Sequence, residues 1–306
     1  MLNAFREQMN SRFAGKKEIV EHVLQCFLAG GHVLLEDVPG VGKTTLARTF
    51  AKSLGLSFGR IQFTPDTMPS DVTGLSVYNM KTGEFSYREG AVMKNILLAD
   101  ELNRTSPKTQ AALLEAMAEA QVTVDGTVYP LPSPFMVIAT QNPVSFTGTF
   151  PLPEAQLDRF MMRLTVGYPD REAEQGLVRA HMEGKYEEEI RPVLNREDVI
   201  ELRRKTMQVQ IADPVIAYAQ EIVAKTREGN GFALGASPRS LIQLLMAARA
   251  KAFLEGRDFV KPDDIKQLVS PVLSHRLMLT SEMKLQKKTA EDLLGLLMLK
   301  VSVPVE

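Results

Sequence analysis

The chain has 306 residues and a formal net charge of −1, with 36 Lys and Arg against 37 Asp and Glu. This balance excludes the basic excess with which many proteins attract nucleic acid or an anionic membrane. With 44% hydrophobic and 24% charged residues, the composition is that of a globular protein rather than a disordered one, and the length allows roughly two domains. The single cysteine, Cys26, excludes an internal disulfide and a thiolate metal cluster, and we expect it to be buried in a helix.

No targeting or membrane-spanning segment is recognisable in the sequence. The first residues, Met1–Ser11, mix charged and polar side chains and lack the apolar stretch of a signal peptide. The apolar run Leu293–Leu299 is much shorter than the ~20 residues that cross a bilayer. We therefore expect a cytoplasmic protein without membrane insertion.

The first half of the chain alternates short apolar runs with helical segments. Thr44–Leu54 is typical of a helix that ends at Gly55. Strands alternating with helices predict a parallel sheet with helices on both faces. The expected strands are His32–Glu36, Gly59–Phe63, Asn95–Ala99, Phe135–Thr140 and Arg163–Val166.

Two segments interrupt this alternation and have the pattern of β-hairpins. Ser76–Tyr87 has strand-forming residues on both sides of a Lys-Thr-Gly turn, and Gln121–Tyr129 has Asp125-Gly126 between two alternating arms. Such hairpins are either contact elements or surface decoration. Their aromatic residues either touch a partner or pack locally, which is the more common role: Tyr78, Phe85, Tyr87 and Tyr129.

After Pro169 the pattern changes to one helix after another. Apolar residues at i, i+3, i+4 and i+7 recur in three segments, and Lys185–Glu189 is expected to be a solvated loop. We place a domain boundary near Tyr168-Pro169, which gives domains 1–169 and 170–306. The three apolar sets are Val215, Tyr218, Ala219 and Ile222; Leu241, Leu244, Leu245 and Ala248; and Ile265, Leu268, Val269 and Val272.

A candidate phosphate-binding loop, DVPGVGKT, lies between the first strand and the following helix. It departs from the G-x-x-x-x-G-K-[ST] pattern because Asp37 replaces the first glycine. Backbone N–H groups from Gly40 onward would face the phosphates, Lys43 would bind the β- and γ-phosphates, and the Thr44 hydroxyl would hold Mg²⁺. The alternative is a Gly-Pro turn before an ordinary helix. The candidate nucleotide-binding residues are Asp37, Val38, Pro39, Gly40, Val41, Gly42, Lys43, Thr44 and Thr45.

A second chemical signal is the apolar strand that ends in Asp100-Glu101. The carboxyl ends of parallel strands form the edge at which open α/β sheets bind ligands. Asp100 would hold Mg²⁺ through water, and Glu101 would orient or deprotonate the attacking water. A strand followed by a solvated acidic pair is the alternative. Together, the loop and the acidic pair predict an enzyme that hydrolyses ATP with Mg²⁺.

The run ILLADELNRTSPKTQAALLEAMAEAQVTVDG, at Ile96–Gly126, resembles the MoxR family of AAA+ ATPases. The resemblance covers nearly the whole chain and keeps the family's order of motifs. The other matching segments are RIQFTPDTMPSDVTG (Arg60–Gly74), ATQNP (Ala139–Pro143), FPLPEAQLDRF (Phe150–Phe160) and GASPRSL (Gly235–Leu241).

The resemblance implies a fold and further site residues. The fold is an α/β P-loop AAA+ αβα core with a parallel sheet and two β-hairpin insertions, followed by an all-α lid domain. Asn142 fits sensor 1, Arg159 in LDRF fits the arginine finger, and Arg239 fits sensor 2. From residue type alone, Asn142 is equally a turn initiator and both arginines are surface residues. Arg104 could face a subunit boundary or a pore.

The resemblance also implies an assembly and a function. An arginine finger acts on the neighbouring subunit, so the active species should be a homo-oligomeric ring, most simply a hexamer. The family is associated with chaperone-like assembly or metal-cofactor maturation of protein clients, often beside partners with von Willebrand factor A domains. The alternatives are a magnesium-chelatase-like motor subunit and a nucleotide-gated scaffold with little turnover. No nucleic-acid partner is expected, because no DNA-binding module or basic track is recognisable.

Overall fold

The computed structural model describes residues 1–13, 15–38, 40–142, 149–184 and 190–304. The chain divides into two compact units, each built from more than one segment. The first unit comprises Met1–Val23, His32–Leu152 and Leu164–Ile200, and the second comprises Leu24–Gly31, Pro153–Arg163 and Glu201–Glu306.

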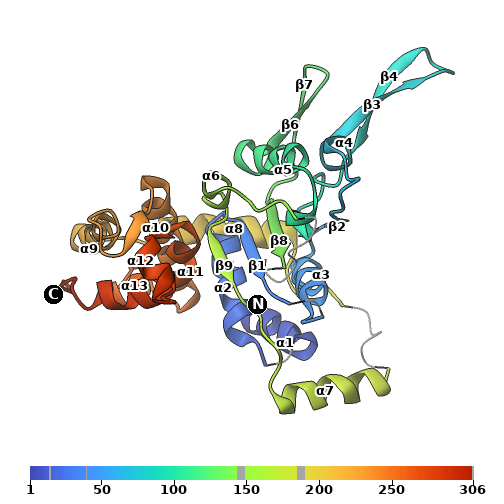
Figure 1. Cartoon of the computed structure of the whole chain (residues 1–306). Helices are drawn as coiled ribbons and strands as arrows, with labels where there is room; N and C mark the ends of the chain where they lie inside the picture. Colours follow the sequence, from blue (N-terminus) through green and yellow to red (C-terminus); the bar gives the residue numbers. More distant parts are fainter. Residues whose placement is uncertain (14, 39, 143–148, 185–189, 305–306) are drawn as a thin grey trace. The chain divides into compact units, whose positions relative to one another are not determined.

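The central sheet has five strands in the order β2-β5-β8-β1-β9 (Figure 1). Neighbouring strands β2, β5, β8 and β1 pair in parallel, so their carboxyl ends meet at one edge. β5 is buried along its whole length, as expected for a central strand covered on both faces. The strands are β1 (Val33–Glu36), β2 (Phe58–Gln62), β5 (Ile96–Asp100), β8 (Met136–Gln141) and β9 (Met162–Leu164).

Helices of the first half of the chain follow the strands as predicted. The helix after β1 begins at Lys43 and ends at Ser53, and Phe50 on it meets Phe5 edge to face at 5.6 Å between ring centroids. Cys26 is buried in a helix, which confirms the prediction. The helices are α1 (Leu2–Arg12), α2 (Lys17–Leu28), α3 (Lys43–Ser53), α4 (Pro69–Thr73), η1 (Leu102–Arg104), α5 (Pro107–Glu119), α6 (Glu154–Leu157) and α7 (Arg171–Met182).

Both predicted hairpins form, and Figure 1 shows them extending from the same side of the first unit beside α4 and α5. In the second hairpin Asp125 and Gly126 have φ angles of 49° and 80°, the positive values of a tight two-residue turn. The rings of Tyr87 and Tyr129 stack at 3.9 Å, which joins the two hairpins. The arms are β3 (Gly74–Asn79) and β4 (Glu84–Glu89), then β6 (Gln121–Val124) and β7 (Thr127–Pro130).

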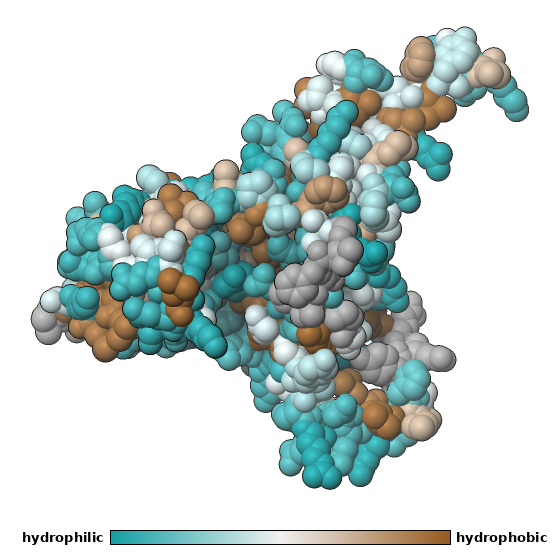
Figure 2. Space-filling model, in the orientation of Figure 1, coloured by the Kyte–Doolittle hydropathy of each residue, from teal (hydrophilic) through white to brown (hydrophobic). Residues whose placement is uncertain are grey.

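The tip of the first hairpin carries exposed apolar side chains. Met80 is 91% exposed and Phe85 is 72% exposed, and Figure 2 shows apolar surface along this hairpin (Figure 2). Tyr78 lies against Phe85 with 5.2 Å between ring centroids. Of the four hairpin aromatics, Tyr87 and Tyr129 therefore pack on each other, whereas Tyr78 and Phe85 remain at the surface.

The described part of the second unit is mainly helical and includes one short antiparallel pair, β10-β11. The apolar set at Val215 to Ile222 is buried in α9, and the set at Ile265 to Val272 is buried in α11, as the spacing predicts. Within the described residues, no helix is both long enough and apolar enough to cross a membrane. The elements are α8 (Arg196–Gln208), which begins in the first unit, α9 (Asp213–Lys225), β10 (Phe232–Leu234), α10 (Pro238–Leu254), α11 (Pro262–Leu273), η3 (Ser274–Arg276), β11 (Met278–Leu279), α12 (Ser281–Leu285) and α13 (Ala290–Met298).

The two units do not divide at the predicted boundary near Tyr168-Pro169. Helix α7 follows this point but lies in the first unit, and the segments 24–31 and 153–163 lie in the second. The change from strands to helices marks where the sheet ends, but it does not show which helices pack beside it. The predicted loop Lys185–Glu189 falls outside the described residues.

Candidate functional site

The loop between β1 and α3 has the backbone of a phosphate-binding loop. Gly40 and Gly42 have φ angles of 86° and 85°, a conformation that glycine adopts without strain. The Lys43 ammonium donates hydrogen bonds to the backbone oxygens of Asp37 and Val38, at 3.0 and 3.1 Å. The lysine side chain therefore folds back along its own loop. Pro39, another predicted member, lies outside the described residues.

Asp37, the residue that replaces the first glycine, fastens this loop to the segment before α7. Its Oδ1 accepts a hydrogen bond from the Val38 N–H at 2.7 Å, and its Oδ2 accepts one from the Gly167 N–H at 2.5 Å. The side chain is nearly buried, so these bonds are shielded from water. A glycine at this position would leave the Gly167 N–H without its acceptor.

A polar cavity of about 380 Å³ lies between the loop and the carboxyl ends of the strands. It brings together seven of the predicted residues, which come from the loop, from the end of β5 and from the end of β8. The structure thus brings residues that lie about a hundred positions apart in the sequence to one cavity. The cavity is lined by Gly40, Gly42, Lys43, Thr44, Arg60, Gln62, Asp100, Glu101, Thr140 and Asn142.

Asp100 is nearly buried, and both of its oxygens have partners. Oδ1 accepts a hydrogen bond from the Thr140 hydroxyl at 2.7 Å, and Oδ2 pairs with the Arg60 guanidinium at 2.7 Å. A carboxylate held by two such partners keeps a fixed orientation. Arg60 lies on β2, beside the strand that carries Asp100, and sequence reasoning gave it no role.

Glu101 has an unusual backbone conformation for a non-glycine residue. Its φ of 56° is left-handed, a conformation that costs roughly 1–2 kcal/mol for an L-residue. Its N–H donates to the Thr140 hydroxyl, and its carboxylate accepts hydrogen bonds from Gln62 and Arg104, each at 2.8 Å. Arg104, whose role the sequence left open, thus contacts the Glu101 carboxylate.

The residues at this edge fit a magnesium ion. The Thr44 hydroxyl and the Asp100 carboxylate line the same cavity, and both are hard oxygen donors of the kind that Mg²⁺ prefers. Mg²⁺ in nucleotide enzymes is commonly held by one or two side chains together with water and phosphate oxygens. Thr44 lies next to Lys43, so phosphates bound by the loop would reach the same place.

A second, mostly apolar cavity of about 420 Å³ adjoins the loop, and sequence reasoning missed it. Gly40 and Gly42 line both cavities, so the loop between β1 and α3 separates a polar space from an apolar one. The Lys16 ammonium donates to the Tyr168 backbone oxygen at 2.7 Å, which fastens one wall. The remaining lining residues are Arg12, Phe13, Lys16, Val41, Thr45, Gly167, Pro169, Leu177, Val178, His181 and Met182.

The walls of this apolar cavity come from α1, the loop, the segment after β9 and α7. No motif joins these segments, and the amphipathic pattern of Arg171–Met182 is the one signal that could have suggested them. Thr45 and Val41, predicted to bind nucleotide as part of the loop, line this apolar side.

Asn142 follows β8 and lines the polar cavity, and its backbone oxygen accepts a bond from the Asn103 side chain at 3.4 Å. Arg159 and Arg239 belong to the second unit. Arg159 follows α6 and is half-buried, and its Nε has no hydrogen-bond partner among the described residues. Arg239 lies exposed in the first turn of α10, which Ser237 caps.

Comparison with known proteins decides the family. The family model described as "ATPase family associated with various cellular activities (AAA)" matches residues 32–162, and the model described as "AAA lid domain" matches residues 224–295. Chaperone MoxR1 of Mycobacterium tuberculosis is 39% identical and aligns over 95% of this chain and 79% of its own length. The chain belongs to the MoxR family of AAA+ ATPases.

Other relatives agree with this assignment. Protein MoxR of Methylorubrum extorquens is 33% identical over 90% of this chain and 87% of its own length. The crystal structure of a proposed ATPase from Cytophaga hutchinsonii superposes with a TM-score of 0.93, at 38% identity, over 99% of this chain and 95% of that one. The predicted fold class and the prediction of an ATP hydrolase are thereby confirmed for this MoxR-family protein.

Proposed function

We propose that this MoxR-family ATPase is a ring-shaped chaperone that uses Mg-ATP hydrolysis to remodel protein clients. The observation that carries the proposal is that Lys43, Thr44, Asp100, Glu101 and Asn142 line one polar cavity beside the apolar cavity at the loop. A nucleotide has the same division, with a charged triphosphate at one end and a flat, largely apolar base at the other.

The loop and its lysine would bind the triphosphate. The N–H groups from Gly40 to Thr44 lie at the start of α3, where the helix dipole favours anions. The Lys43 ammonium would leave the oxygens of Asp37 and Val38 and bind the β- and γ-phosphates. Thr44, and Asp100 through water, would hold Mg²⁺, which neutralises phosphate charge as the reaction proceeds.

Glu101 would orient the attacking water and accept its proton, because its carboxylate lies at the same edge as the loop. The bonds from Gln62 and Arg104 hold this carboxylate in one orientation. Asn142 would contact the γ-phosphate or the water through its amide. The base would lie in the apolar cavity, between Val41 and the side chains of α7.

Arg159 and Arg239, which both belong to the second unit, have roles of their own in the proposal. Arg159 would reach the γ-phosphate of the neighbouring subunit, where such a residue contributes on the order of 10³-fold in rate. Arg239 would respond to the nucleotide of its own subunit. A contact that joins unlike surfaces closes into a ring when the rotation between subunits permits it, and we propose a hexamer.

The remaining expectations about partners belong to the same proposal. The relative named chaperone MoxR1 supports a chaperone role, and the exposed tip of the β3-β4 hairpin offers apolar side chains to a client. A partner with a von Willebrand factor A domain, the absence of a nucleic-acid partner and a cytoplasmic location stay predictions.

The test compares two variants that separate binding from turnover. Glu101→Gln should bind ATP with the wild-type Kd, measured with a fluorescent ATP analogue, and should lose phosphate release. Lys43→Ala should lose binding. A pull-down with Glu101→Gln in ATP, with Lys43→Ala as the control, should retain client proteins on the first variant alone. Wild-type phosphate release from Glu101→Gln would remove Glu101 from its proposed role.

A further inference from the structure

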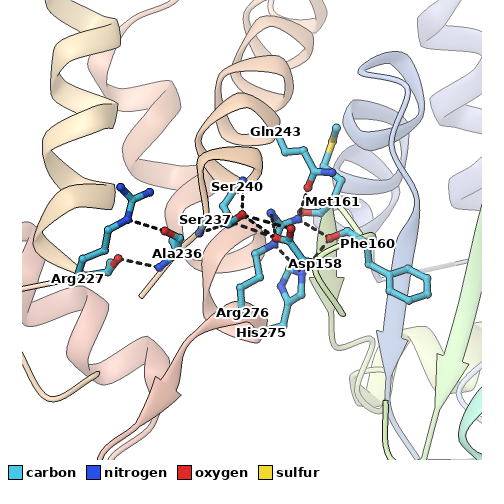
Figure 3. A network of polar contacts seen from close by, with 11 residues as sticks. Asp158, Phe160, Met161, Arg227, Ala236, Ser237, Ser240, Gln243, His275 and Arg276 are labelled. Atoms are coloured by element: carbon cyan, nitrogen blue, oxygen red, sulfur yellow. Dashed lines mark hydrogen bonds and ion pairs between the residues drawn. The ribbon is translucent and has the colours of Figure 1, made fainter. Parts of the chain in front are cut away.

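The residue before Arg159 lies in a polar network within the second unit (Figure 3). Asp158 caps the C-terminal end of α6, and its carboxylate accepts hydrogen bonds from the Ser237 and Ser240 hydroxyls, both at 3.2 Å. The same carboxylate pairs with the Arg276 guanidinium at 3.1 Å. One side chain thus joins α6 to the start of α10 and to η3.

The backbone on the other side of Arg159 is held by the same network. Arg276 donates to the Phe160 backbone oxygen at 2.6 Å and to the Gln243 side chain of α10. Nε2 of His275 lies 2.9 Å from the same Phe160 oxygen. The residues on both sides of Arg159 are therefore fastened to α10 and η3.

Helix α10 is the element that carries Arg239. Ser237 is its N-cap and Ser240 completes the capping box, so the two hydroxyls that bind Asp158 are also those that organise this first turn. Arg239 lies between them in the sequence. Burial lowers the pKa of Arg276, and the charge of Arg239 lowers it further. Arg276 is almost completely buried, so its attraction to Asp158 is only weakly screened.

We propose that Asp158 is a positioning residue that locks Arg159 and the first turn of α10 into one rigid element. The inference rests on the proposed function, in which Arg159 acts on the neighbouring site and Arg239 responds to its own. A movement of α10 that follows the nucleotide bound at one site would then shift Arg159 at the next. Asp158 would transmit the nucleotide state of one subunit to the rate of its neighbour.

The first test asks whether Asp158 acts through Arg159. Asp158→Asn keeps the size of the side chain but removes its charge, and it should lower kcat on the order of 10-fold, since small misplacements of a catalytic group are costly. Asp158→Glu should restore part of the rate. In an Arg159→Ala background, Asp158→Asn should change single-turnover hydrolysis less than twofold. If Asp158→Asn lowered the hydrolysis rate of Arg159→Ala by a further factor on the order of 10, the inference would be overturned.

A matched control separates positioning from general stability. Asp264 is a buried carboxylate of the second unit that, like Asp158, pairs with an arginine, here Arg257 at 2.7 Å. Asp264→Asn should lower the Tm of the second unit as Asp158→Asn does, but it should leave kcat within twofold of the wild type. An equal loss of kcat in both variants would show that Asp158 has only a structural role.

The decisive test uses assemblies that mix two kinds of subunit. One kind, the donor, supplies Arg159 to the ATP site of its neighbour, and the other kind, the acceptor, provides that site. Donors carry Glu101→Gln, so their own sites are inactive, and acceptors carry Arg159→Ala, so they depend on a donor's Arg159. Adding Arg239→Ala to the donor should lower the activity of the mixture about fivefold, although the donor itself hydrolyses nothing. In a donor that also carries Asp158→Asn, Arg239→Ala should have no further effect.

The outcomes separate this inference from the proposed function. An inactive mixture of the parent donor and acceptor would refute the action of Arg159 on a neighbouring site. If the mixture is active and Arg239→Ala in the donor does not change its ATPase activity, the proposed function would stay supported. The proposal that Asp158 transmits the nucleotide state would then be overturned.

Discussion

The side-chain amide of Gln62 donates a hydrogen bond of 2.8 Å to the carboxylate of Glu101. Gln62 lies at the end of β2 and pairs in register with Asp100 on β5, so the two strands place the amide directly beside the acidic pair. Arg104 approaches the same carboxylate at 2.8 Å. The group proposed to activate water is thus held by two side chains for which the sequence indicated no such contact.

Replacing Gln62 with alanine should therefore slow hydrolysis without weakening ATP binding. The Glu101 carboxylate would lose one of its two donors, and we expect kcat to fall on the order of 10-fold because its orientation is less defined. Steady-state phosphate release gives kcat, and titration with a fluorescent ATP analogue gives Kd. A rise in kcat would mean instead that Gln62 restrains Glu101 in an inactive orientation.

Replacing Asp37 with the glycine of the G-x-x-x-x-G-K-[ST] pattern should weaken ATP binding. Asp37→Gly recreates the G-x-x-x-x-G-K-[ST] pattern, but it removes the acceptor of the Gly167 N–H. We expect a several-fold increase in the Kd for ATP, because the loop and the wall of the apolar cavity are no longer joined. Asp198→Asn, at a half-buried carboxylate that caps α8, is the control and should leave Kd unchanged. Tighter binding by Asp37→Gly would contradict this account.

The apolar cavity should contribute to the affinity for ATP but not for its phosphates. Leu177→Ser removes an apolar wall, and loss of about 1–2 kcal/mol of apolar contact would raise the Kd for ATP roughly 10-fold. The Kd for inorganic tripolyphosphate should stay unchanged, and Leu177→Met should behave as the wild type. Equal weakening of both ligands would place the base elsewhere.

The second unit should become less stable at mildly acidic pH because His275 is buried in its neutral form. Burial, together with the positive charge of Arg276 and Arg163, lowers the pKa of His275 well below its ordinary value of 6.5. Below about pH 6.5 the unfolded chain takes up a proton at this residue that the folded chain refuses. The free energy of unfolding should therefore fall as pH decreases, by at most about 1.4 kcal/mol per pH unit from this group.

Urea unfolding between pH 7.5 and 5.5 measures this dependence. His275→Gln keeps an amide near the Phe160 oxygen and does not titrate, so its free energy of unfolding should depend less steeply on pH than that of the wild type. Identical slopes for the two proteins would show that His275 is not the responsible group.

The elements that could be predicted from the sequence are those with local patterns. The strand before Asp37, the helix after Gly42 and the turn at Asp125-Gly126 each depend on neighbouring residues, and each forms as expected. The acidic pair and the loop meet because parallel strands share one edge.

The features that were missed depend on contacts between distant segments. Asp37 and Gly167 are 130 positions apart, and Gln62 meets Glu101 only because β2 lies beside β5. The apolar cavity needs α7, which the helical pattern after Pro169 assigned to the second domain. Periodicity indicates which face of a helix is buried, but it does not indicate what that face packs against.

The most direct test of the account mixes two variants that are inactive alone. Glu101→Gln subunits lack the proposed base and Arg159→Ala subunits lack the proposed finger, so each homogeneous assembly should release little phosphate. At equal amounts, half of the sites keep Glu101 and half of their neighbours keep Arg159, which predicts about one quarter of the wild-type rate for a ring with shared sites. A mixture no more active than its two components would contradict catalysis between subunits and, with it, the proposed ring mechanism.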